Sequence, residues 1–229
     1  MSHTLPTNLS SLDDRERLST FDGRLLDRTP DPELERLVHR AAKVSGFPIA
    51  LVSLVTEQIQ FFRAQVGLPP DLEASRATDR CTSFCQYVVA GDEPLRIEDA
   101  TREPALPTDL VERYGIRAYV GFPLRVAGKT VGSFCVIDVT PRRLEPAQLE
   151  ELSKLAQAAS ARLESLASSW APPREAQEEQ SHRAWLKVAE SQSLTSLSEQ
   201  FASGRLSFEE FQRGLGALAT LAGALEPKR

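Results

Sequence analysis

Three cysteines, Cys81, Cys85 and Cys135, are the side chains of this sequence with the most distinctive potential chemistry. Two of them lie four residues apart in the stretch TDRCTSFCQYVV, so on a helix they would occupy one face, one turn apart. The same face would also carry apolar residues, namely Phe84, Val88 and Val89. Such a stripe is typical of a helix packed on a sheet, where cysteine acts as a small hydrophobe. The spacing therefore favours a structural role over a reactive one.

Other thiol chemistries fit the spacing less well. A disulfide between Cys81 and Cys85 is disfavoured, because Cβ atoms one helical turn apart are about 5–6 Å distant, whereas a disulfide needs about 3.8 Å. A zinc site would need further ligands, and no histidine or fourth cysteine clusters with these three. We therefore expect no metal and no cofactor. Apolar surroundings would also raise the pKa of Cys85, which argues against a catalytic nucleophile.

Composition limits the classes of partner. The chain has 229 residues, 41% of them hydrophobic, and a formal net charge of -5. This charge argues against nucleic acid or an anionic membrane as a partner. No apolar run suits a signal peptide or a membrane span, and three cysteines fit a reducing compartment. We expect a cytoplasmic protein.

The pattern of apolar residues predicts alternating helices and strands. Asp31 followed by Pro32 indicates a helix start, and Gly46 its end. Further helices are expected at 81–91, about 108–114 and from Pro146 onward. Strands are expected at 49–55, around 62–66, at 94–99, and in a hairpin of 116–126 with 130–138. This order indicates an α+β fold with a mostly antiparallel central sheet and flanking helices.

Two details add to this prediction. Pro123 lies within an expected strand, which should therefore be an edge or carry a bulge at that point. The last helix has apolar residues separated alternately by three and four positions, at Leu149, Leu152, Ala156, Ala159, Leu163 and Leu166. That spacing is typical of a coiled-coil seam and predicts a homodimer.

Four short motifs give the chain a family resemblance. They are SFC at 83–85, DA at 99–100, YVGFPL at 119–124 and CVID at 135–138. With the sequence around them, roughly residues 12 to 167, they resemble a GAF domain of a bacterial, stand-alone type, with a GAF/PAS-like fold. The resemblance implies a sensory module that binds a small molecule in a cavity beside the sheet, or one that only dimerises and transmits. The ligand contacts that it suggests are Phe84, Cys85, Asp99, Tyr119 and Cys135.

The expected domain organisation has four parts. Residues 1–30 form an N-terminal extension, 31–167 the GAF domain, 168–180 a polar linker with prolines, and 181–229 an α-helical hairpin. The hairpin contains GRLSFEEF (204–211), which resembles the start of SHOCT-type C-terminal modules. Because so small a hairpin cannot bury two apolar faces on itself, we expect it to pack on the domain, a dimer mate or another protein.

These observations predict a non-enzymatic sensory or adaptor protein. Binding of an unidentified small molecule would shift the packing of the flanking helices and so change the exposure of the C-terminal hairpin. Two alternatives remain. One is a thiol-dependent enzyme similar to the GAF-type free methionine-R-sulfoxide reductases, with Cys85 or Cys135 reacting. The other is a purely structural dimerisation scaffold.

Overall fold

The computed structural model describes residues 5–21, 24–168, 196–197, 199–200 and 204. Almost all of the predicted linker and C-terminal hairpin lies outside these residues. In the described part of the chain, none of the helices is both long and apolar enough to cross a membrane.

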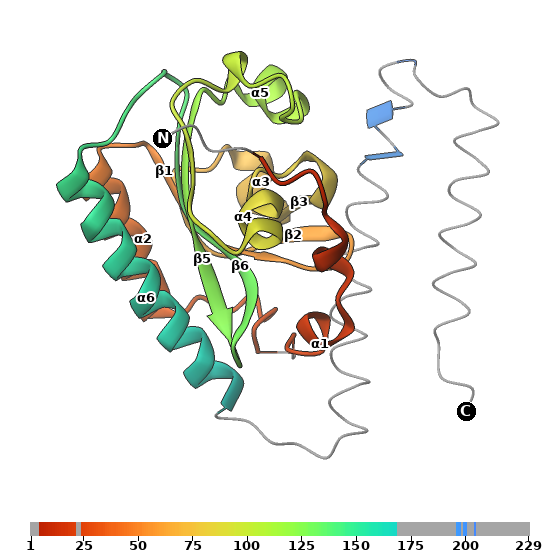
Figure 1. Ribbon diagram of the computed structural model, residues 1–229, viewed down its shortest axis with the longest axis vertical. Helices are drawn as coiled ribbons and strands as arrows, with labels where there is room; N and C mark the ends of the chain where they lie inside the picture. Colours follow the sequence, from red (N-terminus) through yellow and green to blue (C-terminus); the bar gives the residue numbers. More distant parts are fainter. Residues whose placement is uncertain (1–4, 22–23, 169–195, 198, 201–203, 205–229) are drawn as a thin grey trace.

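A six-stranded sheet forms the centre of the protein (Figure 1). Its strands are β1 (Ile49–Val55), β2 (Ile59–Val66), β3 (Ala77–Asp79), β4 (Leu95–Ile97), β5 (Ala118–Val126) and β6 (Lys129–Asp138). Their order across the sheet is β3-β2-β1-β6-β5-β4, and every neighbouring pair is antiparallel. The predicted α+β class with an antiparallel sheet is confirmed.

The helices form two unequal layers on this sheet (Figure 1). They are α1 (Arg15–Leu18), α2 (Pro32–Ser45), α3 (Pro70–Ser75), α4 (Cys85–Gly91), α5 (Asp109–Tyr114) and α6 (Pro146–Ser168). Short 3₁₀ turns lie at η1 (Ser10–Asp13), η2 (Arg80–Thr82) and η3 (Ala100–Arg102). The long helices α2 and α6 pack side by side on one face, and the short helices lie on the other.

Helix α2 begins and ends where the sequence predicts. The Asp31 side chain accepts hydrogen bonds from the backbone amides of Glu33 (3.1 Å) and Leu34 (3.0 Å), which caps the helix. Gly46 ends it in the left-handed conformation, with φ of 71°. Asp31 also accepts a hydrogen bond from Arg162 at 2.7 Å, so one buried carboxylate joins α2 to α6.

The apolar stripe of α6 is buried within its own chain. Leu152, Ala156, Ala159 and Leu163 are all buried, and the helix packs against β5 and α2. A spacing of three and four residues suits a helix lying on a sheet as well as a coiled coil. The expected seam therefore faces the protein's own core and is not free to pair with a second helix.

The helix containing Cys85 is shorter than predicted. Cys81 lies in the separate turn η2, and Ser83 is extended, with ψ of 134°. Helix α4 begins only at Cys85. Cys81 is therefore exposed and does not share a helical face with Cys85, which is buried. The rest of the predicted stripe (Phe84, Cys85, Val88 and Val89) is buried as expected.

Proline 123 lies where its strand has a neighbour on one side only. Residues 119–121 of β5 pair with β4, whereas Pro123 pairs with Ser133 of β6, beyond the end of β4. Because proline has no amide hydrogen, it fits this locally unpaired edge. The expectation of an edge at this point is confirmed.

The sheet separates two hydrophobic cores. Strand β1 supplies both, since Ala50, Val52 and Leu54 face α2 and α6, while Ile49, Leu51 and Val55 face the short helices. The second core also contains Leu12 of η1. The predicted N-terminal extension, residues 1–30, thus contributes to the packing on this face.

Candidate functional site

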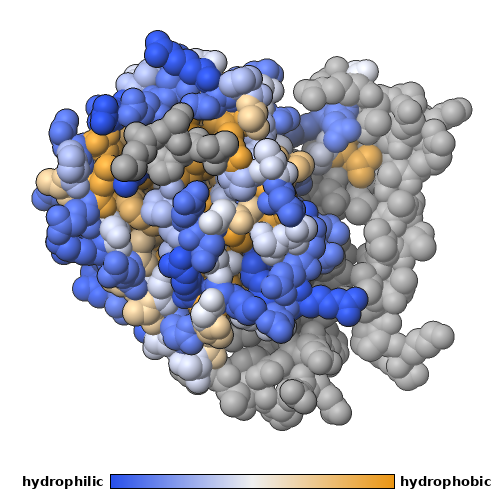
Figure 2. Space-filling model, viewed as in Figure 1, coloured by the Kyte–Doolittle hydropathy of each residue, from blue (hydrophilic) through white to orange (hydrophobic). Residues whose placement is uncertain are grey.

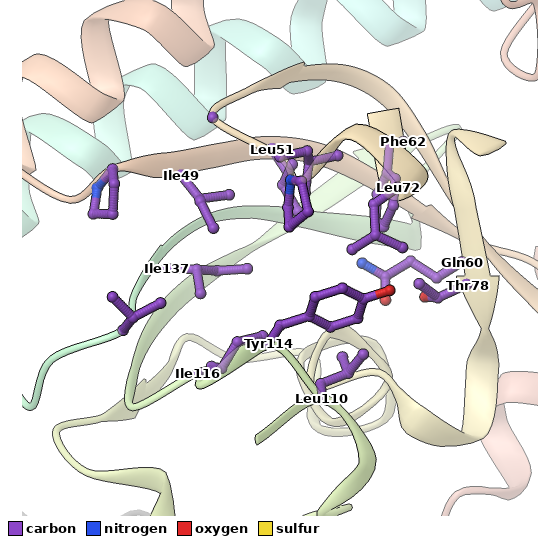
Figure 3. A pocket seen from close by; sticks show the side chains of 15 residues that line it. Ile49, Leu51, Gln60, Phe62, Leu72, Thr78, Leu110, Tyr114, Ile116 and Ile137 are labelled. Carbon is purple, nitrogen blue, oxygen red and sulfur yellow. The ribbon is translucent and has the colours of Figure 1, made fainter. Parts of the chain in front are cut away.

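An apolar cavity of about 320 Å³ lies beside the sheet, between its β1–β2–β3 side and helices α3 and α5 (Figure 3). Its lining is mainly aliphatic and aromatic and includes Ile49, Leu51, Phe62, Leu72, Leu110, Tyr114, Ile116 and Ile137. Val139, a half-exposed residue, also lines it. In the face shown in Figure 2, hydrophobic residues gather in the upper part of the described domain, within largely hydrophilic surroundings. The volume is at the lower end of the range for small-molecule sites.

One end of this cavity is polar. Gln60 and Thr78 are cross-strand partners on β2 and β3, and the Tyr114 hydroxyl points toward both (Figure 3). The Tyr114 hydroxyl donates a hydrogen bond to Asp71 at 2.6 Å, and burial together with this bond raises the pKa of Tyr114. The Thr78 hydroxyl is buried and has no hydrogen-bond partner among the described residues. The cavity therefore offers a hydrogen-bonding group that a ligand could satisfy.

A cluster of thiols and hydroxyls lies behind this polar end. The sulfur atoms of Cys85 and Cys135 are 3.8 Å apart, joining α4 to β6. The Tyr119 hydroxyl donates to the Cys85 sulfur at 3.3 Å and lies 3.0 Å from the Ser133 hydroxyl. Because a phenol has a single proton, Ser133 donates to Tyr119 when Tyr119 donates to Cys85.

The side chain of Gln60 connects the cavity to the thiols. It lines the cavity, and its amide nitrogen donates to the Cys85 sulfur at 3.4 Å. Gln60 is almost fully buried, so this contact is shielded from bulk water. A molecule that touches Gln60 would therefore be one side chain away from the thiol pair.

Gly121 makes room for the Tyr119 side chain. A Cβ atom on Gly121 would lie 2.3 Å from the Tyr119 hydroxyl and 2.6 Å from the Ser133 hydroxyl. Real Cβ atoms do not approach other atoms so closely, so only glycine permits this arrangement. The Tyr-x-Gly spacing on β5 thus has a steric cause, since the tyrosine hydroxyl occupies the space of the missing side chain.

The two thiols have opposite tendencies to ionise. Burial opposes ionisation of Cys85, but hydrogen bonds from Cys135, Tyr119 and neighbouring serines outweigh it and lower the pKa of Cys85 to about 7. Burial and the adjacent Cys85 raise the pKa of Cys135 well above its ordinary value. The expected raised pKa of Cys85 is therefore wrong, because polar groups converge on its sulfur within the apolar core.

The five predicted ligand contacts are divided between two places. Cys85, Cys135 and Tyr119 lie together, and Phe84 meets the Tyr119 ring edge-on, with centroids 5.7 Å apart. Asp99 instead caps η3 and binds the Arg117 guanidinium at 2.9 and 3.0 Å. This pairing holds the pKa of Asp99 well below its ordinary value.

None of these five residues is among those that line the cavity. Their role as ligand contacts stays a prediction, and a molecule confined to this cavity would meet no sulfur atom. Sequence reasoning missed Gln60, Thr78 and Tyr114 as the polar end. The buried polar residue Gln60, in a strand otherwise rich in apolar side chains, is the signal that could have revealed it.

Metal binding finds no support in the described ranges. In residues 5–21, 24–168 and the few described beyond, no three His, Cys, Asp or Glu side chains gather as a metal site would require. The chemistry available at the site is therefore that of a thiol pair, hydroxyls and one amide beside an apolar cavity.

A comparison with curated proteins links the chain to an enzyme. It is 36% identical over 141 residues to a cyclic di-GMP phosphodiesterase of Pseudomonas aeruginosa. The match covers 58% of this chain and spans only 23% of that protein's length. The prediction that this protein is not an enzyme is contradicted by this finding, because the matching relative is itself named as one.

Solved structures share the fold at low identity. The GAF domain of a Coxiella burnetii phosphoenolpyruvate-protein phosphotransferase aligns with a TM-score of 0.51 and 15% identity, covering 71% of this chain and 99% of that domain. A free methionine-R-sulfoxide reductase of Neisseria meningitidis aligns with a TM-score of 0.50 and 13% identity, covering 74% of this chain and 99% of that one. The GAF domain family matches residues 29–163, more than half of the sequence. The antiparallel sheet between two helical layers and this match together establish that the chain belongs to the GAF domain family.

Proposed function

We propose that this protein is a sensory unit whose signal is a small, mainly apolar molecule held in the cavity between the sheet and helices α3 and α5. The molecule carries one polar group, which contacts Gln60 and Thr78. The observation that carries this proposal is the buried, unpartnered Thr78 hydroxyl at the one polar end of an apolar cavity. A buried hydroxyl without a partner is unfavourable, and a ligand group would relieve it.

The lining supports this choice of ligand class. Apolar residues dominate the cavity, and no Lys or Arg is among those that line it. A phosphate or a nucleotide would lack a cationic partner there. A ligand of low polarity would be held by burial of apolar surface and oriented by one or two hydrogen bonds.

Occupancy of the cavity would act on an enzymatic output through the helices and strands around it. The output we propose is the turnover of cyclic di-GMP, because the P. aeruginosa relative, 23% of whose length is matched, is named as a cyclic di-GMP phosphodiesterase. In this proposal the C-terminal segment contacts the protein that receives the signal. Arg113 of α5, a helix bordering the cavity, binds Glu199 of that segment at 2.9 Å.

Ligand binding is tested with a pair of variants on one helix. Leu110→Trp places a large ring in the cavity, whereas Glu112→Trp places the same ring on the exposed side of α5. The full chain, purified from the cells that produce it, is examined by native mass spectrometry for a releasable small molecule. We expect the molecule in the parent and in Glu112→Trp and its loss in Leu110→Trp. Equal occupancy of both variants would place the molecule elsewhere and overturn the proposal.

The polar end is tested by removing a single hydroxyl. Thr78→Val keeps the side-chain shape, and Thr108→Val makes the same change at an exposed position outside the cavity. Loss of one hydrogen bond should weaken binding roughly twofold to tenfold in Thr78→Val alone. Identical affinities for the two variants would show that Thr78 does not contact the ligand.

The output is tested in cells. Deletion of the gene should change the cyclic di-GMP concentration, and Leu110→Trp should reproduce that change while Glu112→Trp should not. An unchanged concentration after deletion would refute the proposed output and leave the ligand site to be judged by its own binding data.

A further inference from the structure

The thiol cluster has features that a merely space-filling pair of cysteines does not need. Cys85 and Cys135 are both free and buried, and their sulfur atoms are 3.8 Å apart. Two hydrogen-bond donors, the Tyr119 hydroxyl and the Gln60 amide, point at the Cys85 sulfur. In an apolar core such donors would normally be absent, and they stabilise a thiolate more than a thiol.

We propose that Cys85 and Cys135 form an oxidisable dithiol, which a peroxide converts into an intramolecular disulfide between α4 and β6. A disulfide has its sulfurs about 2.05 Å apart, so the two atoms must approach by about 1.8 Å. The residues belong to different elements, Cys85 to the first turn of α4 and Cys135 to the middle of β6. A small shift of the short helix on the sheet can supply the approach.

The reaction balances with hydrogen peroxide as the oxidant. The Cys85 thiolate attacks one peroxide oxygen, the O–O bond breaks, and the departing oxygen leaves as water after taking up the proton released by Cys85. Cys85 is then a sulfenic acid. The Cys135 sulfur attacks the sulfenic sulfur, the S–S bond forms, and a second water leaves with the proton of Cys135. Two thiols lose two electrons, and one peroxide gains them.

The assignment of Cys85 as the attacking thiol rests on its surroundings. The Tyr119 hydroxyl and the Gln60 amide both donate to the Cys85 sulfur. Tyr119 and Ser133 also lie near Cys135, but burial and the adjacent Cys85 outweigh them and raise the pKa of Cys135. Tyr119 is a positioning residue in this step, since it orients and stabilises the thiolate without touching the oxidant. Its own position depends on the space left by Gly121.

A route to the thiols leads through the cavity. Gln60 lines the cavity and its amide contacts Cys85, so displacement of this side chain is the step by which a peroxide in the cavity would reach the sulfur. When the Cys85 sulfur moves toward Cys135, the Gln60 amide loses its acceptor. Oxidation therefore changes the polar end of the cavity as well as the packing of α4.

Cys81 provides an internal control for exposure. It lies in η2, is solvent-exposed, and does not share the cluster. An oxidant that reacts by exposure alone would modify Cys81 first, whereas the proposed pair reacts because its two sulfurs adjoin each other. Cys81→Ser in the full chain removes this competing thiol and any disulfide between copies.

The experiment treats the folded Cys81→Ser protein with hydrogen peroxide and measures its mass, its free thiols and its cross-linked peptides. We expect a mass lower by two hydrogen atoms, no free thiol, a peptide joining Cys85 to Cys135, and full reversal by dithiothreitol. Cys85→Ser and Cys135→Ser, each in the same background, should not form this product. Two thiols that stay free, or that oxidise only to sulfinic acid, would overturn the proposal.

The role of Tyr119 is tested by the rate and its pH dependence. In Tyr119→Phe we expect disulfide formation to be roughly twofold to tenfold slower near neutral pH, as loss of one hydrogen bond to the thiolate predicts. The difference should vanish at alkaline pH, where Cys85 is ionised in both proteins. An unchanged rate at neutral pH would overturn the assignment of Cys85 as the attacking thiol.

Discussion

Replacing Gly121 with alanine would disturb the thiol cluster by a single carbon atom. The new Cβ atom would lie 2.3 Å from the Tyr119 hydroxyl and 2.7 Å from its ring carbon Cζ. Gly121 is in the middle of β5, paired with Leu95 and Cys135 on either side, so its backbone cannot move away easily. The buried tyrosine must therefore leave its place.

The expected loss of stability follows from these contacts. Moving the Tyr119 ring breaks its hydrogen bonds to Cys85 and Ser133, at about 1 kcal/mol each. Overpacking of a core adds about 1–3 kcal/mol. The free energy of unfolding should fall by about 3–5 kcal/mol, and the melting temperature by roughly 10 °C for a domain of this size.

Urea unfolding monitored by circular dichroism measures this difference, and Gly91→Ala is the matched control. A Cβ atom on Gly91 would make only ordinary contacts, with Glu93 at 3.5 Å and Pro6 at 3.6 Å. Gly91 is the last residue of α4, so alanine there should be neutral or stabilise by up to about 1 kcal/mol. The two glycine-to-alanine changes should thus differ clearly.

A double-mutant cycle with Tyr119→Ala identifies the cause. Without the ring the new methyl group at position 121 has space, so Gly121→Ala should become much less costly in that background. A Gly121→Ala variant as stable as Gly91→Ala, or strictly additive effects in the cycle, would refute the argument that Tyr119 requires the glycine.

Three further outcomes are expected. Burial raises the pKa of Asp31, but Arg162 and the capping amides outweigh this and lower the pKa below its ordinary value. The contribution of the Asp31 carboxylate to folding stability is therefore fully present above the unfolded-state pKa of about 4. It is lost as the pH falls through the lower pKa of the folded state. Asp31→Asn should then destabilise at pH 7 by about 1–2 kcal/mol and much less at pH 2, measured by urea unfolding; equal effects would exclude the ion pair. Disulfide formation between Cys85 and Cys135, 50 residues apart, should raise the free energy of unfolding by up to about 4 kcal/mol, and an unchanged or lower urea midpoint after oxidation would indicate a strained bond. Gly132→Ala should lower the yield of folded protein more than Gly121→Ala, because its Cβ would lie 2.0 Å from a β1 carbonyl oxygen; a normal circular dichroism spectrum and yield would contradict this.

The helices and strands were predicted from the sequence more accurately than the tertiary contacts around them. The cap at Asp31, the apolar run 49–55 and the hairpin of β5 and β6 each depend on neighbouring residues, and all were found where expected. The start of α4 was misplaced, because an extended residue at Ser83 interrupts a pattern that would otherwise continue as a helix. Local patterns do not show such a break.

The site was harder to predict than the fold, for two physical reasons. The cavity is lined by residues from β1, β2, α3, β3, α5 and β6, and no spacing along the chain relates them. The apolar stripe of α6 has a spacing compatible with packing on a sheet and with pairing to a second helix. Only the burial of these residues against the sheet distinguishes the two. The proximity of Cys85 and Cys135 likewise depends on how α4 lies across β6.

Strand β1, like β2, β5 and β6, carries residues of both cores, so a change at the cavity can reach the long helices through the sheet. The residues of β1 alternate between the two cores, so the same sheet contacts the cavity on one face and helices α2 and α6 on the other. A displacement on the cavity side is then passed on as a tilt or twist of the sheet. Helix α6 has 23 residues and is about 34 Å long, so a small rotation at one end displaces the other end. A tilt of about 2° at its base would move its far end by about 1.2 Å, enough to alter contacts at the point where the C-terminal segment begins.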